Sequence, residues 1–247
     1  METKKGISGA ILKWLAIVTM LIDHIGASIV KYQYIADHTD YLNELPYNIL
    51  RNIGRIAFPI FIFLLVEGYQ HTKSRKNYLI RLLIFGLISE IPFDMAFKTR
   101  FFYWKYQNVF FTLALGVIAI WIMDELNKKS SRFIKNAANL KLYNIFLDIG
   151  VTLVFCLLAE FLETDYHSVG ILAICAAWLL KDRRYLQMPV CCLVLLLSSA
   201  REWYALIACI PILFYNGKRG RQHKYFSYFF YPVHLLILGY ISMFVMK

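Results

Sequence analysis

A lysine and a histidine at helical spacing are the first residues in this chain that could do chemistry. Lys13 and His24 lie eleven residues apart in one apolar stretch. At 100° per residue they share a stripe of an α-helix to within about 20°, about 16 Å apart along its axis. A histidine can act as a general base near neutral pH when a second group fixes its tautomer. The spacing therefore predicts a polar stripe with His24 deep inside a helix and Lys13 near one end.

Other ionisable and polar residues also fall inside apolar stretches, where charge is unfavourable and often marks function. By their order along the chain we expect them in two layers. The outer layer comprises Asp23, His24, Arg51, Arg55, Glu90, Asp94 and Asn108. The inner layer comprises Lys13, Glu67, His71, Arg81, Tyr231 and His234. A structural interpretation stays open, in which Arg55 only pairs with Glu90 or Asp94 and Lys13 only extends to the membrane surface.

The elements that must position these side chains are transmembrane helices. Residues of the AVILMFWYC set make up 59% of the chain and charged residues only 17%, an imbalance that excludes an ordinary soluble enzyme and a disordered chain. We expect an all-α, polytopic membrane helix bundle that forms a single domain, residues 1–247. About nine spans of helix are predicted, at residues 10–30, 53–68, 78–97, 109–123, 146–162, 169–180, 186–199, 203–215 and 230–246.

The positive charge of the chain gives the predicted topology. The net charge is +11, and most lysines and arginines fall in alternate loops, at 1–13, 71–81, 124–141, 181–184 and 216–224. Basic loops favour the cytoplasmic side, so the N-terminus is predicted to lie inside. The short seventh and eighth spans could instead form a hairpin, which the same rule allows. This origin of the charge argues against nucleic-acid binding. No metal-binding motif occurs in the sequence, so we expect no metal.

Several longer strings of residues carry a family resemblance. They are IDHIG at 22–26, IGRIAFPIF at 53–61, EGY at 67–69, LISEIPFD at 87–94, QNVFFTL at 107–113 and YPVHLL at 231–236. With them the chain resembles the TraX family, whose founding member is the F-pilin N-acetyltransferase. The Lys13-to-His24 spacing is also similar to the basic-residue-x10-His signature of the acyltransferase-three superfamily, although those proteins usually have Arg where this chain has Lys.

The resemblance implies a multi-pass acetyltransferase of the bacterial cytoplasmic membrane. It would move an acetyl group from cytosolic acetyl-CoA to an amine or hydroxyl of an extracytoplasmic peptide or small acceptor, with a peptide N-terminus favoured. His24 would be the general base, Glu90 or Asp94 would orient it, and Asn108 or Arg55 would stabilise the oxyanion. The residues expected to hold acetyl-CoA are Lys13, His71, Arg81, Tyr231 and His234. The thioester would reach His24 along a continuous polar passage.

Two other classes of protein stay open. In a proton-coupled transporter the same histidine and carboxylates would form a proton relay. The absence of repeated halves in the sequence argues against this class. A non-catalytic scaffold of a secretion or pilus apparatus would need no polar stripe.

Overall fold

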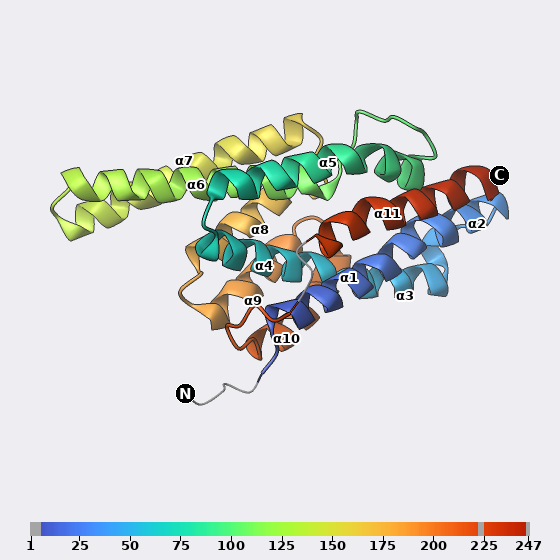
Figure 1. Cartoon of the computed structure of the whole chain (residues 1–247), viewed down its shortest axis with the longest axis horizontal. Helices are drawn as coiled ribbons and strands as arrows, with labels where there is room; N and C mark the ends of the chain where they lie inside the picture. Colours follow the sequence, from blue (N-terminus) through green and yellow to red (C-terminus); the bar gives the residue numbers. More distant parts are fainter. Residues whose placement is uncertain (1–5, 222–224, 246–247) are drawn as a thin grey trace.

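The protein is a bundle of helices, as the predicted all-α class requires. The computed structural model describes residues 6–221 and 225–245. Within these ranges the regular structure is helical, with isolated bridges at Ile7–Tyr215 and Gln107–Thr164 (Figure 1). The α-helices are α1 (Gly9–Ile25), α2 (Lys31–Ala36), α3 (Leu45–Gly54), α4 (Ala57–His71), α5 (Arg75–Lys98), α6 (Val109–Phe133), α7 (Ala137–Phe161), α8 (His167–Leu179), α9 (Arg184–Leu195), α10 (Cys209–Leu213) and α11 (Phe226–Tyr240). Shorter π- or 3₁₀-helices are η1 (Gly26–Val30), η2 (Tyr41–Asn43), η3 (Ala200–Ala208) and η4 (Ile241–Val245).

Polar caps fix where several helices begin. Ser8, Ser74 and Asn136 precede α1, α5 and α7, and each side chain accepts a hydrogen bond from a backbone N–H of the first turn. Such a cap satisfies donors that have no partner within the helix. The sequence therefore specifies these helix starts locally.

The second apolar segment of the chain is interrupted between α3 and α4, next to the cavity described below. Helix α3 ends at Gly54 and α4 begins at Ala57. Pro59 has no N–H to donate to the carbonyl of Arg55, so the hydrogen-bond ladder of a continuous helix fails at this point. The break places Arg55 at a helix end inside the bundle.

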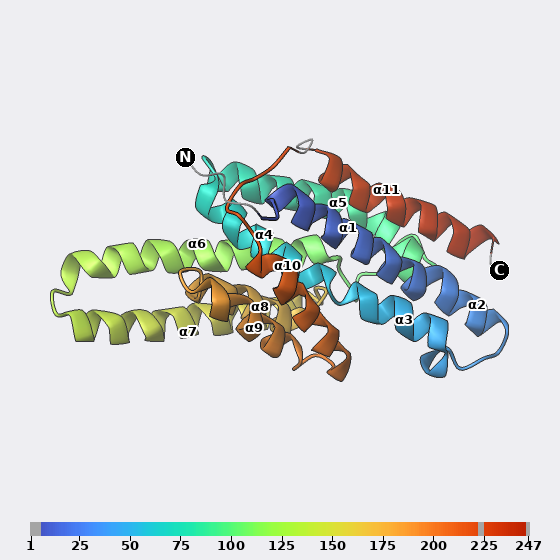
Figure 2. The same cartoon turned by 90° about the horizontal axis from the view of Figure 1, so that it is seen from below.

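Helices α1, α5 and α11 run side by side in the same direction (Figures 1 and 2). Lys13 of α1 donates to Ser227 near the start of α11, and His24 contacts His234 further along both helices. Helices α5 and α11 form the most extensive contact between elements. A Cβ on Gly239 of α11 would lie 2.6 Å from Cβ of Met95, so the missing side chain allows this close approach.

The α6–α7 hairpin extends beyond the other helices (Figures 1 and 2). The sequence predicted a loop at 124–141, and this is corrected: α6 continues to Phe133 and α7 starts at Ala137. Hydropathy marks the part of a helix that suits lipid, whereas backbone hydrogen bonding continues past it to the C-cap Ile134, and Asn136 then caps the start of α7. Polar pairs join the extension, including Ser130 with Asn144 at 2.6 Å.

The protein has the character of a membrane protein. Five segments are long and apolar enough to cross a bilayer: Gly9–Ala36, Leu45–His71, Val109–Phe133, Ala137–Phe161 and Phe226–Phe244. Helices α8 and α9 are apolar but shorter, and the 24-residue α5 carries several charges. Nine crossings and an inside N-terminus remain predictions. The predicted seventh and eighth spans correspond to α9 and to η3 with α10, which pack against each other.

The bundle has two ends of different composition. The basic end holds the start of α1, the turn between α4 and α5 and the turn between α6 and α7. The opposite end, which we call the cavity end after the cavity described below, holds α2 and the α5–α6 loop, residues 99–108 (Figure 1). The predicted basic segments 1–13 and 216–224 are at the basic end as far as the structure describes them, and residues 1–5 and 222–224 lie outside the described residues.

Candidate active site

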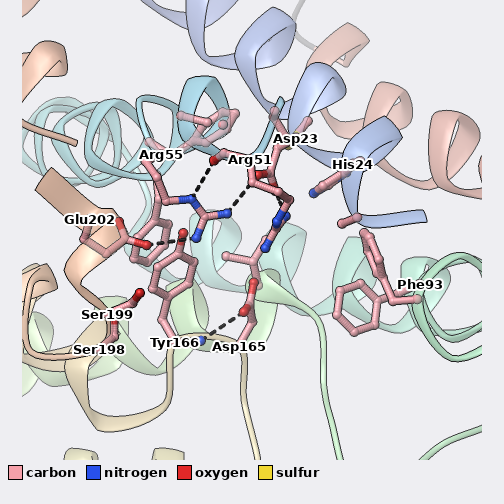
Figure 3. Close-up of a pocket in the computed structure, with 18 of the residues that line it drawn as sticks. Asp23, His24, Arg51, Arg55, Phe93, Asp165, Tyr166, Ser198, Ser199 and Glu202 are labelled. Atoms are coloured by element: carbon pink, nitrogen blue, oxygen red, sulfur yellow. Dashed lines mark hydrogen bonds and ion pairs between the residues drawn. The ribbon is translucent and has the colours of Figure 1, made fainter. Parts of the chain in front are cut away.

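A cavity of about 390 Å³ lies between the helices at the cavity end, and Figure 3 shows its lining. Aromatic and aliphatic side chains form much of its wall, as in many binding sites for small molecules. Its polar and charged lining residues are Asp23, His24, Lys31, Tyr47, Arg51, Arg55, Lys98, Tyr106, Asp165, Tyr166, Ser198, Ser199, Glu202 and Tyr231.

An ion-pair network forms one wall of the cavity (Figure 3). Arg55 donates to Asp23 Oδ1 and to Glu202 Oε1, each at 2.8 Å, and Arg51 donates to Asp23 Oδ2 at 2.5 Å. The Asp23 and Glu202 side chains are only 11% and 1% exposed, so these charges depend on one another rather than on water. The network joins α1, α3 and η3.

Gly54 makes room for the network. A Cβ at this position would lie 2.1 Å from Asp23 Oδ1 and 2.2 Å from Asp23 Cβ. Because Gly54 has no side chain, Asp23 can pack against the backbone between Arg51 and Arg55, which lie one helical turn apart.

His24 contacts a second histidine at the cavity. His24 Nδ1 lies 2.7 Å from His234 Nε2, and His234 Nδ1 lies 2.7 Å from the carbonyl oxygen of Phe230. The carbonyl can only accept, so His234 Nδ1 carries a proton. A neutral His234 then accepts at Nε2, and His24 must donate from Nδ1. This assignment leaves His24 Nε2 with a free lone pair, which is the form of imidazole that can take up a proton.

A change in helix geometry follows His24 directly. The π-helix η1 begins at Gly26, and Ser28 Oγ donates to the His24 carbonyl at 2.5 Å. Such π segments within α-helices are frequent at functional sites, because they leave backbone groups free and re-aim side chains. A Cβ on Gly26 would lie 2.8 Å from Leu50 Cβ, so glycine also permits α3 to approach here.

The α5–α6 and α7–α8 loops supply a further part of the wall, next to Arg55 (Figure 3). Asp165 accepts hydrogen bonds from the Tyr106 hydroxyl at 2.7 Å and from the Tyr166 N–H at 3.0 Å. Burial raises the pKa of the Asp165 carboxyl above its usual value, and the Tyr106 hydrogen bond and the Arg55 charge oppose this shift. Tyr166 stacks on Phe58, with ring centroids 3.8 Å apart.

The comparisons with known proteins agree with the resemblance carried by the sequence strings. The profile of the family described as TraX protein matches residues 8–242. The chain belongs to the TraX family.

Two relatives match most of this TraX-family chain. It is 28% identical to a Dichelobacter nodosus protein described as a probable fimbrial assembly protein FimC of serogroup H1, and the alignment covers 95% of both chains. It is 26% identical to an uncharacterised protein of Rickettsia prowazekii strain Madrid E, over 83% of this chain and 68% of that one. No solved structure matches the chain.

Three of the predicted site residues of this TraX protein line the cavity: His24, Arg55 and Tyr231. His234 lies directly behind His24, which corrects its predicted place in the inner layer. The predicted last span began at residue 230, whereas α11 begins at Phe226. Residues 231 and 234 are therefore one turn further from the basic end than the sequence indicated, at the level of His24.

Glu90 and Asp94 do not orient His24, contrary to the prediction. Glu90 accepts from the side chain of Asn108, and Asp94 Oδ2 accepts from the Tyr103 N–H at 2.5 Å. Both carboxylates secure the loop between α5 and α6. The group that fixes the His24 tautomer is His234 instead.

Asn108 is the N-cap of α6, which corrects its predicted role at an oxyanion. Its Oδ1 accepts from the Phe110 N–H at 3.0 Å. Its Nδ2 donates to the Gly86 carbonyl at 2.8 Å and to Glu90, so both amide protons are used. A fully buried amide with no free proton cannot stabilise a developing negative charge.

The predicted inner cations are spread over the basic end and do not line the cavity. Lys13 donates to Ser227 at 3.4 Å, His71 contacts the Glu67 carbonyl at 2.8 Å, and Arg81 lies over the Tyr78 ring at 5.8 Å. Between Lys13 and His24 on α1, the side chains of Ala16 and Ile17 are buried. The passage from the basic end to the cavity stays a prediction.

Sequence reasoning missed several lining residues, among them Glu202, Asp165, Lys31 and Lys98. Glu202 had a signal, because it stands in the short polar interruption between the predicted seventh and eighth spans. Asp165 lies in the acidic segment 163–167, which the sequence indicated only as a loop. The lysines follow apolar runs and looked like ordinary membrane-surface residues.

Proposed function

We propose that this TraX-family protein is a membrane acetyltransferase whose active site is the cavity at His24. It would transfer an acetyl group from acetyl-CoA to an amine or hydroxyl of an acceptor, a peptide N-terminus being favoured. In this proposal the protein lies in the bacterial cytoplasmic membrane with its cavity end outside. The family membership and the fimbrial description of the Dichelobacter nodosus relative support a substrate at the cell surface.

The observation that carries the proposal is the hydrogen-bond chain from His24 through His234 to the Phe230 carbonyl. It leaves His24 Nε2 able to accept a proton from an acceptor that enters the cavity. As Nε2 gains the proton, His24 becomes positively charged and its Nδ1–H bond to His234 strengthens. General-base catalysis of this kind contributes about 10²–10⁴-fold to a rate.

Arg51 is the best placed group for the oxyanion. Arg55 uses Nη1, Nη2 and Nε for Glu202, Asp23 and the Arg51 carbonyl. Arg51 also lines the cavity, and within the described residues its buried Nε has no hydrogen-bond partner. We therefore assign the stabilisation of the oxyanion, which the sequence suggested for Arg55, to Arg51. Arg55 instead positions Arg51 through their shared partner Asp23.

The donor side of the proposal has a different basis. Lys13, His71 and Arg81 contact different partners and do not line the cavity. The use of acetyl-CoA is therefore proposed from the family alone, and the residues argued here act on the acceptor.

Acetyl transfer by the purified protein tests the proposal. Protein in lipid nanodiscs receives acetyl-labelled acetyl-CoA and a set of amine and peptide acceptors, and labelled product and free CoA are measured. We expect His24→Asn to lower the rate at least 100-fold while the protein still folds and inserts. His38→Asn, a change of an exposed histidine in the loop before η2, serves as the matched control and should keep the wild-type rate.

Two substitutions of His234 separate positioning from packing. Leu removes the acceptor for the His24 Nδ1–H, whereas Gln retains an oxygen that can accept it. We expect His234→Leu to lower the rate about 10–100-fold, as for a group that orients a catalytic histidine, and His234→Gln to restore part of the loss. Equal rates in the two variants contradict the relay. Proton-coupled solute uptake that requires His24, without acetyl transfer, supports a transporter instead.

A further inference from the structure

Two lysines line the cavity without a carboxylate partner. Lys31 lies at the start of α2 and Lys98 at the end of α5, and both are half-buried. Among the described residues neither forms an ion pair. Asp94, one turn before Lys98, accepts from the Tyr103 N–H instead.

Aromatic rings take the place of counter-ions. The Lys31 ammonium lies 5.5 Å from the ring centroids of Tyr32 and Tyr41. The Lys98 ammonium lies 5.1 Å and 4.6 Å from those of Tyr103 and Tyr106. Cation–π contacts hold an ammonium group in place without neutralising its charge.

A hydrogen bond fixes the two lysine-bearing segments to each other. The Tyr32 hydroxyl donates to the Phe97 carbonyl at 2.7 Å. Tyr32 and Phe97 are the immediate chain neighbours of Lys31 and Lys98. This cross-link holds the two ammonium groups on neighbouring elements at the same part of the cavity, although their charges repel.

The rest of the cavity does not supply the missing negative charge. Arg51 and Arg55 are offset by Asp23 and Glu202 in the ion-pair network. The remaining carboxylate of the lining, Asp165, is engaged with Tyr106 and Tyr166. The cavity lining thus holds four basic side chains against three carboxylates. Lys98 also interacts electrostatically with Asp94 one turn away without forming an ion pair, and an anionic ligand would offset the remaining positive charge.

We propose that the acceptor is an amine or alcohol that also carries an anionic group, a phosphate or a carboxylate, and that Lys31 and Lys98 bind this group. This inference rests on the proposed function, because it places the reacting amine or hydroxyl at His24. Lys31 follows His24 by seven residues, with the π-helix η1 between them, so the anion sits further along the helix, toward the cavity end. The thioester donor is not the source of the anion, since its phosphates belong to the cytosolic side in the proposed topology.

Matched probes with and without the anionic group test this proposal by binding. O-Phosphoethanolamine is compared with ethanolamine, and β-alanine with β-alanine amide, by the rise in unfolding temperature of the full-length protein in detergent. We expect an anionic probe to bind at least tenfold more tightly than its neutral partner. Replacing both lysines, Lys31→Gln with Lys98→Gln, should remove this preference, because each charge-assisted hydrogen bond is worth about tenfold in affinity. The matched control is Lys105→Gln, an exposed lysine that also stacks on an aromatic ring, that of Trp104, and does not line the cavity.

Transfer assays then identify the source of the anion. Nanodiscs of phosphatidylcholine with or without phosphatidylethanolamine are compared with soluble phosphoethanolamine and β-alanine as acceptors, and the acetylated products are found by mass spectrometry. Acetylation of the lipid assigns the anion to a headgroup, and acetylation of a soluble probe assigns it to a free acceptor. Either result supports the proposal if the double lysine variant no longer acetylates the anionic acceptor but still acetylates neutral amines.

Other results overturn the inference about the anion site without deciding whether the protein is an acetyltransferase. Equal binding of charged and neutral probes to the wild-type protein overturns it, as does an unchanged preference in the double lysine variant. A raised KM for acetyl-CoA alone in that variant also overturns it, because the lysines would then serve the donor. Since binding is measured without turnover, an inactive His24→Asn protein that retains the preference keeps the anion site.

Discussion

Within the described residues, two clusters have one arginine that binds two carboxylates, and they lie at opposite ends of the bundle. At the cavity, Arg55 pairs with Asp23 and Glu202, each at 2.8 Å. At the basic end, Arg75 pairs with Asp124 at 2.5 Å and with Glu125 at 2.8 Å. The distances are similar, but the surroundings differ: Glu202 is 1% exposed and Glu125 is 48% exposed.

The difference teaches that geometry alone does not make an ion pair important. Water screens the basic-end cluster and can replace any partner, so such pairs contribute about 0–1 kcal/mol. In the cavity cluster the Asp23 and Glu202 side chains are only 11% and 1% exposed, so removal of one partner leaves a poorly solvated charge uncompensated. Only the cavity cluster joins three separate elements and borders the space in which a ligand can bind.

Removal of the central carboxylate should have the largest effect. Asp23→Asn leaves both Arg51 and Arg55 without their shared partner. We expect a loss of about 3–5 kcal/mol of unfolding free energy, the usual consequence of breaking a buried pair. The measurement is unfolding in mixed micelles titrated with SDS and followed by circular dichroism.

Asp124→Asn is the matched change in the basic-end cluster, where we expect a loss below about 1 kcal/mol. If Asp23→Asn proves too unstable to purify, the more conservative Asp23→Glu, which keeps the charge but lengthens the side chain, is measured beside Asp124→Glu. Equal losses in a matched pair would remove the distinction between the two clusters.

The sequence predicted three residues that line the cavity but not all of their partners. His24 and Arg55 stood out because a charged or titratable group in an apolar helix is unusual. Glu202 is 147 residues from Arg55 in the chain, and only the folding of η3 against α3 and α4 brings them together. A single sequence contains no information on a contact of that range.

The second source of error was the predicted depth of individual residues along the membrane-spanning helices. The aromatic residues 225–231 are typical of a membrane interface, so the last span was predicted to begin at residue 230. The structure continues α11 back to Phe226, and His234 therefore meets His24. Likewise Asn108 and Glu90 are polar groups in the expected region, but they serve a helix cap, a role that a motif alone does not distinguish from catalysis.

A substitution at Gly54 tests the packing of the cavity cluster without removing any of its charges. The expected loss of unfolding free energy is smaller than that for Asp23→Asn. In Gly54→Ala the new methyl would overlap Asp23, whose side chain must move away from Arg51 and Arg55. Overpacking of this kind costs about 1–3 kcal/mol. The variant should also bind ligands in the cavity less well, because the wall built by the network shifts.

Gly150 of α7 supplies the control for this prediction, since a Cβ there meets no atom within 4 Å. In Gly150→Ala we expect no loss and a gain of up to about 1 kcal/mol from the lower entropy of the unfolded chain. A loss in Gly150→Ala as large as that in Gly54→Ala would point to a general effect of helix glycines instead of the contact with Asp23.

Replacement of Arg75 should have the smallest effect on the free energy of unfolding. It tests the basic-end cluster. Arg75→Ala removes both ion pairs of the basic-end cluster, yet Lys128 remains 2.7 Å from Asp124 and still offsets its charge. We expect a loss of about 0–1 kcal/mol that shrinks further as salt is raised from 0.05 to about 0.5 M, because exposed charges are screened over such distances. Packing of the Arg75 guanidinium on the Tyr69 ring, 4.8 Å from its centroid, is the one contact that salt does not weaken in the same way. A salt-independent loss would therefore assign the stabilisation to this ring contact, and a loss above about 3 kcal/mol would show that the basic-end cluster behaves as a buried one.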